Sequence, residues 1–251
     1  MMLNCLTEKL RSIARLALDI TALAWFIAFA AGSAHAQYVL PNFCNAYLTV
    51  QSKSYLVSHF YTCHEDTEGL KRRIDLDEQG EIYHVQTDVE ARWLYALDMT
   101  SGISENLDDT GSIDRAFLTN LLQKDHDDFV FQMLSSSGEI IALRGEDQLM
   151  GQTVIIDDTL LFQTKSMMKA TDTKGTFLWD TLANEYVSLK HWVFFGGSNV
   201  YRTDKVTKFF NFSPIEFLLP NEVGFLADVP KSGSEGIMSS LGMTGVYHDK
   251  I

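Results

Sequence analysis

Apolar and polar residues alternate with a period of two between residues 44 and 97. At residues 55–63 the odd positions hold Tyr, Val, His, Tyr and Cys, and the even positions include Leu56, Phe60 and Thr62. Successive side chains of a β-strand point to opposite faces, so a period of two indicates strands. The pattern predicts four strands here, at residues 46–51, 55–63, 70–76 and 81–87.

Short turn sequences separate these alternating runs along the chain. Asp77-Glu78-Gln79-Gly80 predicts a hairpin in which Gly80 takes a positive φ. Residues 129–202 repeat the pattern, with turns at 135–138, 157–158 and 172–175 between short apolar runs. Parallel strands need long crossovers, and these connections are too short for them. We therefore expect a mainly β fold with one or two helices, an antiparallel meander that forms a curved sheet or partly closed barrel.

Helical spacing occurs in two places. Ser112 suits an N-cap, and an apolar series from Ile113 to Leu122 follows it, so we expect a helix from Ile113 to Lys124. Asp125, His126, Asp127 and Asp128 would then form a solvated turn. Residues 88–97 hold apolar side chains at i, i+4 and i+8, which leaves helix and strand both open for this segment.

The chain divides into three parts on this reading. Residues 1–36 precede a single β-rich domain at 37–229, and residues 230–251 are rich enough in Gly, Ser and Lys to predict a flexible tail. Two similar halves, 44–97 and 129–202, could be joined by the helical insert. Each half holds a Glu ahead of a Trp-centred apolar run, at Glu90 and at Glu185.

The first 36 residues have the features of a secretory signal. Lys9, Arg11 and Arg15 precede an apolar stretch at 22–31, and the segment ends in Ala34-His35-Ala36. A retained membrane anchor is the alternative, although a spanning helix needs about 20 apolar residues. We expect a cleaved signal, no stable membrane anchor after cleavage, and a periplasmic or secreted mature chain.

Two cysteines, Cys44 and Cys63, remain after residue 36. In an oxidising compartment an even pair favours a disulfide, which would close a loop of about 19 residues and stabilise the fold by roughly 3 kcal/mol. The alternative is a metal pair that includes His59 and Cys63, but two ligands do not complete a site.

The charge balance narrows the classes of partner. The net charge is −13 for the whole chain and becomes −14 once residues 1–36 are removed. Binding to a phosphate backbone needs clustered Lys and Arg, so we expect no nucleic-acid partner. The basic run at 71–73 is flanked by acidic residues.

One loop resembles part of a calcium-binding loop. Asn106, Asp108, Thr110 and Asp114 place side-chain oxygens at positions 1, 3, 5 and 9, and Gly111 occupies position 6. Position 12, which needs a bidentate Glu, is Phe117. The alternative is a polar loop that caps the following helix. Calcium is the one cofactor that the sequence suggests.

Catalytic motifs give little direction. The chain contains no G-x-S-x-G, phosphate-binding loop or G-x-G-x-x-G. Glu90 and Glu185 are the candidates for a pair of catalytic acids, while a surface or ion-paired role is the alternative.

Three hypotheses for function follow. The first is an exported, non-enzymatic protein of the cell envelope that binds a small apolar ligand or a protein partner, with Trp93, Trp179 and Trp192 facing a sheet interior. The second is a hydrolase that depends on carboxylates. The third is a structural module stabilised by calcium.

Overall fold

The computed structural model describes residues 37–231, so the expected signal segment and most of the expected tail lie outside the described residues. One helix and thirteen strands make up this part of the chain. The helix is α2 (Leu118–Lys124), and the strands are β1 (Cys44–Ser52), β2 (Leu56–Cys63), β3 (Lys71–Asp77), β4 (Gly80–Thr87), β5 (Trp93–Asp98), β6 (Ser104–Asp108), β7 (His126–Ser135), β8 (Ile140–Ile156), β9 (Thr159–Thr171), β10 (Phe177–Ser188), β11 (Val193–Arg202), β12 (Thr207–Asn211) and β13 (Pro214–Leu218).

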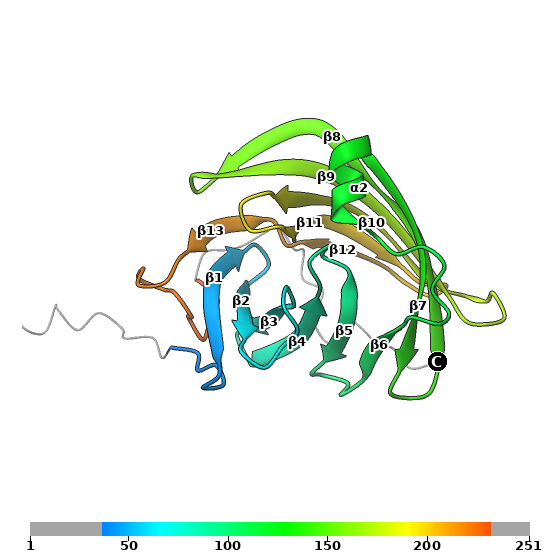
Figure 1. Cartoon of the computed structure of the whole chain (residues 1–251), viewed down its shortest axis with the longest axis horizontal. Helices are drawn as coiled ribbons and strands as arrows, with labels where there is room; N and C mark the ends of the chain where they lie inside the picture. The colour runs from blue at the N-terminus through cyan, green and yellow to red at the C-terminus, as the bar shows by residue number, and fades with distance from the viewer. Residues whose placement is uncertain (1–36, 232–251) are drawn as a thin grey trace, which may run out of the picture. The chain divides into compact units, whose positions relative to one another are not determined.

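All thirteen strands belong to a single antiparallel sheet (Figure 1). Each strand from β1 to β12 pairs with the next one along the chain, and β13 returns to pair with β1. The expected antiparallel meander is confirmed, and the sheet curves without closing into a barrel. Its two edges, β12 and β13, are consecutive in the chain and are joined by Phe212 and Ser213.

The turn between β1 and β2 holds this link between the two edges. The Lys53 amide donates to the Ser213 carbonyl at 3.0 Å, and the Ser54 hydroxyl donates to the Asn211 carbonyl at 2.9 Å. These bonds fix the return of the chain from one edge of the sheet to the other.

The segment 88–97, for which helix and strand were both open, contributes residues 93–97 to strand β5. The short apolar runs on either side of Gly151 belong to one strand of 17 residues, β8, because a register shift between Leu149 and Thr153 absorbs the irregular segment around Gly151. The hairpin at Gly80 is confirmed, and Gly80 has a φ of 122°.

The expected helix begins five residues later than its N-cap signal indicated. Ile113 and Asp114 donate backbone bonds to the Val130 carbonyl, so this stretch adds to the sheet instead of starting a helix. The Ser112 hydroxyl donates to the Asp108 carbonyl at 2.6 Å and accepts from the Gln132 amide at 3.1 Å. Ser112 therefore stabilises a loop, and α2 starts at Leu118.

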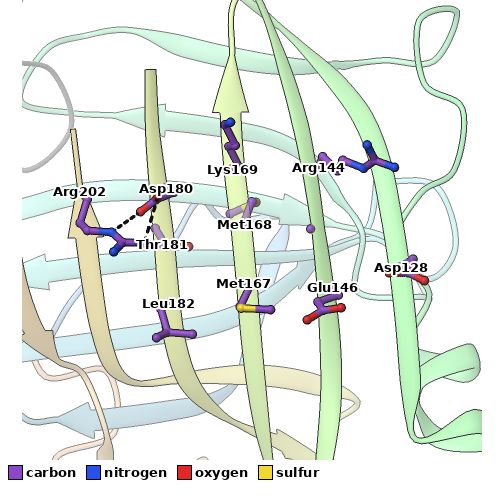
Figure 2. Close-up of a pocket in the computed structure, with 11 residues that line it drawn as sticks. Asp128, Arg144, Glu146, Met167, Met168, Lys169, Asp180, Thr181, Leu182 and Arg202 are labelled. Carbon is purple, nitrogen blue, oxygen red and sulfur yellow. Dashed lines mark hydrogen bonds and ion pairs between the residues drawn. The ribbon is translucent and has the colours of Figure 1, made fainter. Parts of the chain in front are cut away.

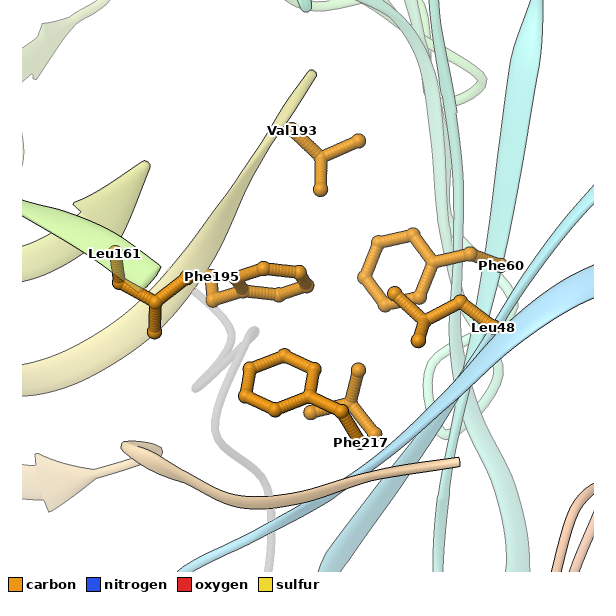
Figure 3. Packing of buried hydrophobic residues seen from close by; sticks show 7 residues of the cluster. Leu48, Phe60, Leu161, Val193, Phe195 and Phe217 are labelled. Atoms are coloured by element: carbon orange, nitrogen blue, oxygen red, sulfur yellow. The ribbon is translucent and has the colours of Figure 1, made fainter. Parts of the chain in front are cut away.

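The inner face of the curved sheet is packed where two parts of the sheet face each other (Figure 3). We call these parts its two walls: β1, β2 and β13 contribute to one, and β9 and β11 contribute to the other. Phe60 of β2 lies edge-on to Phe195 of β11 at 5.5 Å between ring centroids, and Phe195 lies against Phe217 of β13 at 5.1 Å. Leu48, Val50, Leu161 and Val193 complete this cluster. Side chains from strands far apart in the sequence thus fill the space where a ligand cavity could have formed.

Apolar side chains cover the outer face of β1 to β3. Val57, Tyr61, Ile74 and Leu76 form a cluster there, packed by residues that include Tyr38 and Leu40. The last described segment also crosses this face, where Lys231 contacts Gln51 and Glu216. The outer face of this part of the sheet is therefore covered.

Candidate functional site

Strand alternation sends neighbouring acidic residues of β7 and β8 to opposite faces of the sheet. Asp127 and Asp147 pair across the two strands, and both are buried. Asp128 and Glu146 form the next pair, and the Asp128 side chain is 73% exposed. The inner and outer faces therefore hold two separate groups of acids.

The inner group is centred on Glu185 of β10. Its side chain keeps a small accessible surface. Burial, and then the negative charge of Asp147, raise the pKa of Glu185 to about 8, while Arg73 acts in the opposite direction. Burial also raises the pKa of Asp147 to about 6, against a hydrogen bond from Ser166. At neutral pH these values favour a protonated Glu185.

Two cations of β3, Lys71 and Arg73, lie on the same inner face as this group. Arg73 pairs with Asp75 at 3.0 Å, and the Ser58 hydroxyl donates to the Asp75 carboxylate at 2.6 Å. Lys71 donates to the carbonyls of His191 and Trp192, both at 2.9 Å, which ties β3 to the β10–β11 turn. The inner polar residues therefore join the two walls of the sheet.

Glu90 and Glu185, the candidate catalytic pair, lie in unlike settings. The Glu90 carboxylate accepts from the Thr119 amide at 3.0 Å and from its hydroxyl at 2.9 Å, so Glu90 caps the N-terminus of α2. Asp127 assists by accepting from the Phe117 amide at 2.6 Å. The bonds described for Glu90 lead to the helix and none leads to Glu185.

The four candidate calcium residues are spread over a strand and the loop after it. Asn106 and Asp108 belong to β6, and Asp114 lies in an isolated bridge with Val130. The Asp108 carboxylate accepts from the Thr110 amide at 3.0 Å and the Thr110 hydroxyl at 2.7 Å. These hydrogen bonds lower the pKa of Asp108. The described contacts are those of a polar turn.

The two cysteines form the expected disulfide. Cys44 and Cys63 face each other across β1 and β2, and their sulfurs are bonded. The metal-pair alternative is wrong because both thiols are used. His59 has its own partners as well: its Nδ1 lies 3.0 Å from the Thr49 hydroxyl, and its Nε2 lies 3.1 Å from the Ala227 carbonyl.

A shallow depression of about 410 Å³ opens on the outer face of β7 to β11 (Figure 2). We call it the outer groove. Its apolar floor is Met167 of β9 beside Leu182 of β10, which are 40% and 38% exposed. Arg144, Lys169, Asp180 and Arg202 lie along one side, and Asp128 and Glu146 lie at one end.

Strand register extends the floor of the outer groove into a longer apolar row. Leu182 pairs with Val200 of β11, and Val200 pairs with Phe209 of the edge strand β12. Phe209 is 67% exposed. Met167, Leu182, Val200 and Phe209 therefore form one apolar row across four strands, in which Val200 is half-buried and the other three side chains are exposed. A largely exposed contiguous row of this kind indicates an interaction surface.

The neighbouring row carries cations that lack ion-pair partners. Arg144 and Lys169 are opposite each other on β8 and β9. Arg202 pairs with Asp180 at 2.7 Å, but among the ion pairs of residues 37–231 none includes Arg144 or Lys169. Two like charges placed opposite each other across strands destabilise a sheet. Their arrangement favours an anionic ligand between them.

Sequence reasoning missed the outer groove for a definite reason. It assigned residues 125–128 to a solvated turn, whereas β7 begins at His126. The alternation of Asp127 inward and Asp128 outward was therefore hidden, as was the row that Asp128 starts. The signal was present in residues 144–148, where Arg144, Glu146 and Gln148 alternate with Gly145 and Asp147.

Comparisons with known proteins identify no relative. No protein-family model, curated protein or solved structure matches the chain. Within residues 37–231 no helix has the length and apolar character needed to cross a membrane.

Proposed function

We propose that the chain is an exported binding protein whose outer groove holds an amphiphile with an anionic headgroup. The observation that carries this proposal is the outer groove itself, where Arg144 and Lys169, neither of which is in an ion pair of residues 37–231, lie along one side of a largely exposed apolar row. Lys169 Nζ also lies 5.7 Å from the centre of the Phe177 ring. The headgroup would lie between the two cations, and its alkyl chain would follow Met167, Leu182, Val200 and Phe209.

The dimensions suit such a ligand. Small-molecule sites commonly measure roughly 300–1,000 Å³, and the outer groove of about 410 Å³ lies in this range. Neighbouring strands lie about 4.8 Å apart, so the row from β9 to β12 spans roughly 14 Å. Each methylene that leaves water on this row contributes about 0.8 kcal/mol.

The binding site in this proposal lies on the outer face rather than inside the sheet. Sequence reasoning placed an apolar ligand in the interior, but Phe60, Phe195 and Phe217 pack together there. The inner carboxylates, Glu185 and Asp147, contribute to the layer that joins the walls. The geometry therefore favours the binding hypothesis over a hydrolase that uses these acids.

The test is a binding titration of the full chain with dodecanoate, dodecyl phosphate and uncharged dodecanol. We expect both anions to bind at least about tenfold more tightly than the alcohol, a difference of about 1.4 kcal/mol. The double variant Arg144→Gln/Lys169→Gln should remove this preference, and Lys174→Gln, in an exposed turn, should keep it.

Two results would overturn the proposal. One is equal affinity for the anions and the alcohol, which would leave no role for Arg144 and Lys169. The other is unchanged anion binding in Met167→Asp and Leu182→Asp, which would place the ligand elsewhere on the molecule.

We also propose that the mature chain begins at Gln37 and acts in the periplasm or outside the cell. The Cys44–Cys63 disulfide supports an oxidising compartment. Mass spectrometry of the protein from its producing cell should find Gln37 as the first residue and both cysteines protected from alkylation. A chain that retains Met1, and in which Cys44 and Cys63 are both free thiols, would refute the export proposal.

A further inference from the structure

We propose that His126, Asp128 and Glu146 form a binding site for a divalent metal ion of the zinc class. This inference goes beyond the amphiphile site and does not depend on it. The three side chains project from the outer face of β7 and β8, and their potential ligand atoms all lie within 4.8 Å of one another.

Strand geometry places these three side chains together. His126 and Asp128 are two residues apart on β7 and therefore share a face. Glu146 is the direct cross-strand partner of Asp128 on β8. The intervening residues, Asp127 and Asp147, are buried on the opposite face, so their anchoring holds the three ligands outward.

The donor set selects the class of metal. One imidazole nitrogen with two carboxylate oxygens suits zinc, manganese, cobalt or nickel, whereas calcium and magnesium prefer oxygen alone. Zinc bonds of about 2.0–2.2 Å place two ligands of one ion roughly 3–4 Å apart. His126 Nε2 and Asp128 Oδ2 already lie 3.2 Å apart, and the exposed Asp128 side chain can adjust toward Glu146.

The electrostatics of this position favour a bound cation. Asp128 and Glu146 place two negative charges directly opposite each other, an arrangement that destabilises an antiparallel pair. Arg144 lies two residues from Glu146 on the same face, yet no ion pair of residues 37–231 joins it to either carboxylate. A divalent ion would supply the missing positive charge.

Three protein ligands leave at least one coordination position for water or for an anionic group. Asp128 and Glu146 also line one end of the outer groove. A metal held there would therefore be open to solvent and to molecules in the outer groove, rather than enclosed as in a structural zinc site.

The test is titration of the full chain, without any amphiphile, with zinc chloride by calorimetry and with cobalt chloride by visible absorption. We expect one zinc ion per chain with a Kd below about 100 μM, and cobalt bands that zinc abolishes. His126→Asn, Asp128→Asn and Glu146→Gln should each weaken zinc binding by at least about tenfold.

His64→Asn is the matched control, because His64 is an exposed residue directly after β2 and lies outside the three-residue group. It should bind zinc like the parent chain. Far-ultraviolet circular dichroism of each variant checks that the sheet is intact. The proposal is wrong if zinc does not bind in this range, or if the His126, Asp128 and Glu146 variants bind as the parent does.

Discussion

The inner and outer faces of β7 to β11 carry the same residue types, but the inner ones are buried and the outer ones are accessible. Asp147 is buried on the inner face, and its pKa is raised to about 6. Glu146, its neighbour in sequence, lies on the outer face within reach of His126 and Asp128. Glu146 and Asp147 point to opposite faces because successive side chains of a strand alternate. Two adjacent acidic residues therefore contribute one to the buried inner group and one to the outer group.

Apolar residues follow the same division. Phe195 and Phe217 are buried on the inner face and hold its walls together, whereas Phe209 and Leu182 are exposed on the outer face. The inner face therefore contributes stability, and the outer face remains available for binding.

Removing an aromatic ring tests the difference most severely. Phe195→Ala should lower the free energy of unfolding by about 3–5 kcal/mol, because a cavity replaces the contacts with Phe60 and Phe217. Phe209→Ala should change it by less than about 0.5 kcal/mol. Urea unfolding of both variants measures these values, and equal losses would abolish the distinction between the faces.

A rise in pH from about 4.3 to 8 should destabilise the fold through Glu185. Its pKa of about 8 in the folded chain exceeds the unfolded value of about 4.3. The contribution is therefore fully present below pH 4.3 and is lost as the pH rises through 8, at a cost on the order of 5 kcal/mol. Glu185→Gln should flatten the pH dependence of urea unfolding between pH 5 and 9 relative to the parent chain.

Glu146→Gln, on the outer face, is the reference for this prediction. It should leave the pH dependence of urea unfolding between pH 5 and 9 as it is in the parent chain. Parallel curves for the parent and for Glu185→Gln would show that the inner carboxylate does not control the slope.

Acidic pH should destabilise the fold through His59, which lies on the covered part of the outer face. Burial lowers the pKa of His59 to about 4, below the unfolded value of about 6.5. Its contribution is present above pH 6.5 and is lost as the pH falls through 4, by about 3 kcal/mol. His59→Asn should reduce this acid-side slope, whereas the exposed His64→Asn should retain it. Thermal unfolding from pH 7 to 4 distinguishes them.

The smallest effect concerns the like-charged pair on the uncovered outer face. Without metal, Asp128→Asn should raise the free energy of unfolding by about 0.2–1 kcal/mol, because it removes repulsion with Glu146. The same variant should lose any stabilisation by zinc. A loss of stability in metal-free buffer would show that Asp128 has a favourable structural partner.

Much of the fold could be predicted from the sequence, because hairpin turns and a period of two are local signals. The disulfide was also predicted, from two cysteines and the expected export of the chain. The start of α2 did not, because the bonds from Ile113 and Asp114 to Val130 are tertiary contacts. A local N-cap signal at Ser112 cannot reveal that a distant strand offers those residues other partners.

The candidate sites were harder to predict. Glu185 was selected for its position before a Trp-centred run, but its raised pKa depends on Asp147 and on the packing of the interior. The group of His126, Asp128 and Glu146 depends on the register between β7 and β8. Register is set by the whole sheet, and a shift of one residue would turn these side chains inward.

The return of β13 to β1 has a consequence for folding kinetics. Thr49 pairs with Leu218, so β1, the first strand of the described chain, has β13, its last strand, as its second neighbour. Contacts of such high sequence separation form slowly because loop closure must precede them. Until they form, β1 presents an unpaired edge that can recruit other chains. A chaperone that shields this edge should therefore increase the yield of folded protein more than one that acts on the β7–β11 hairpins.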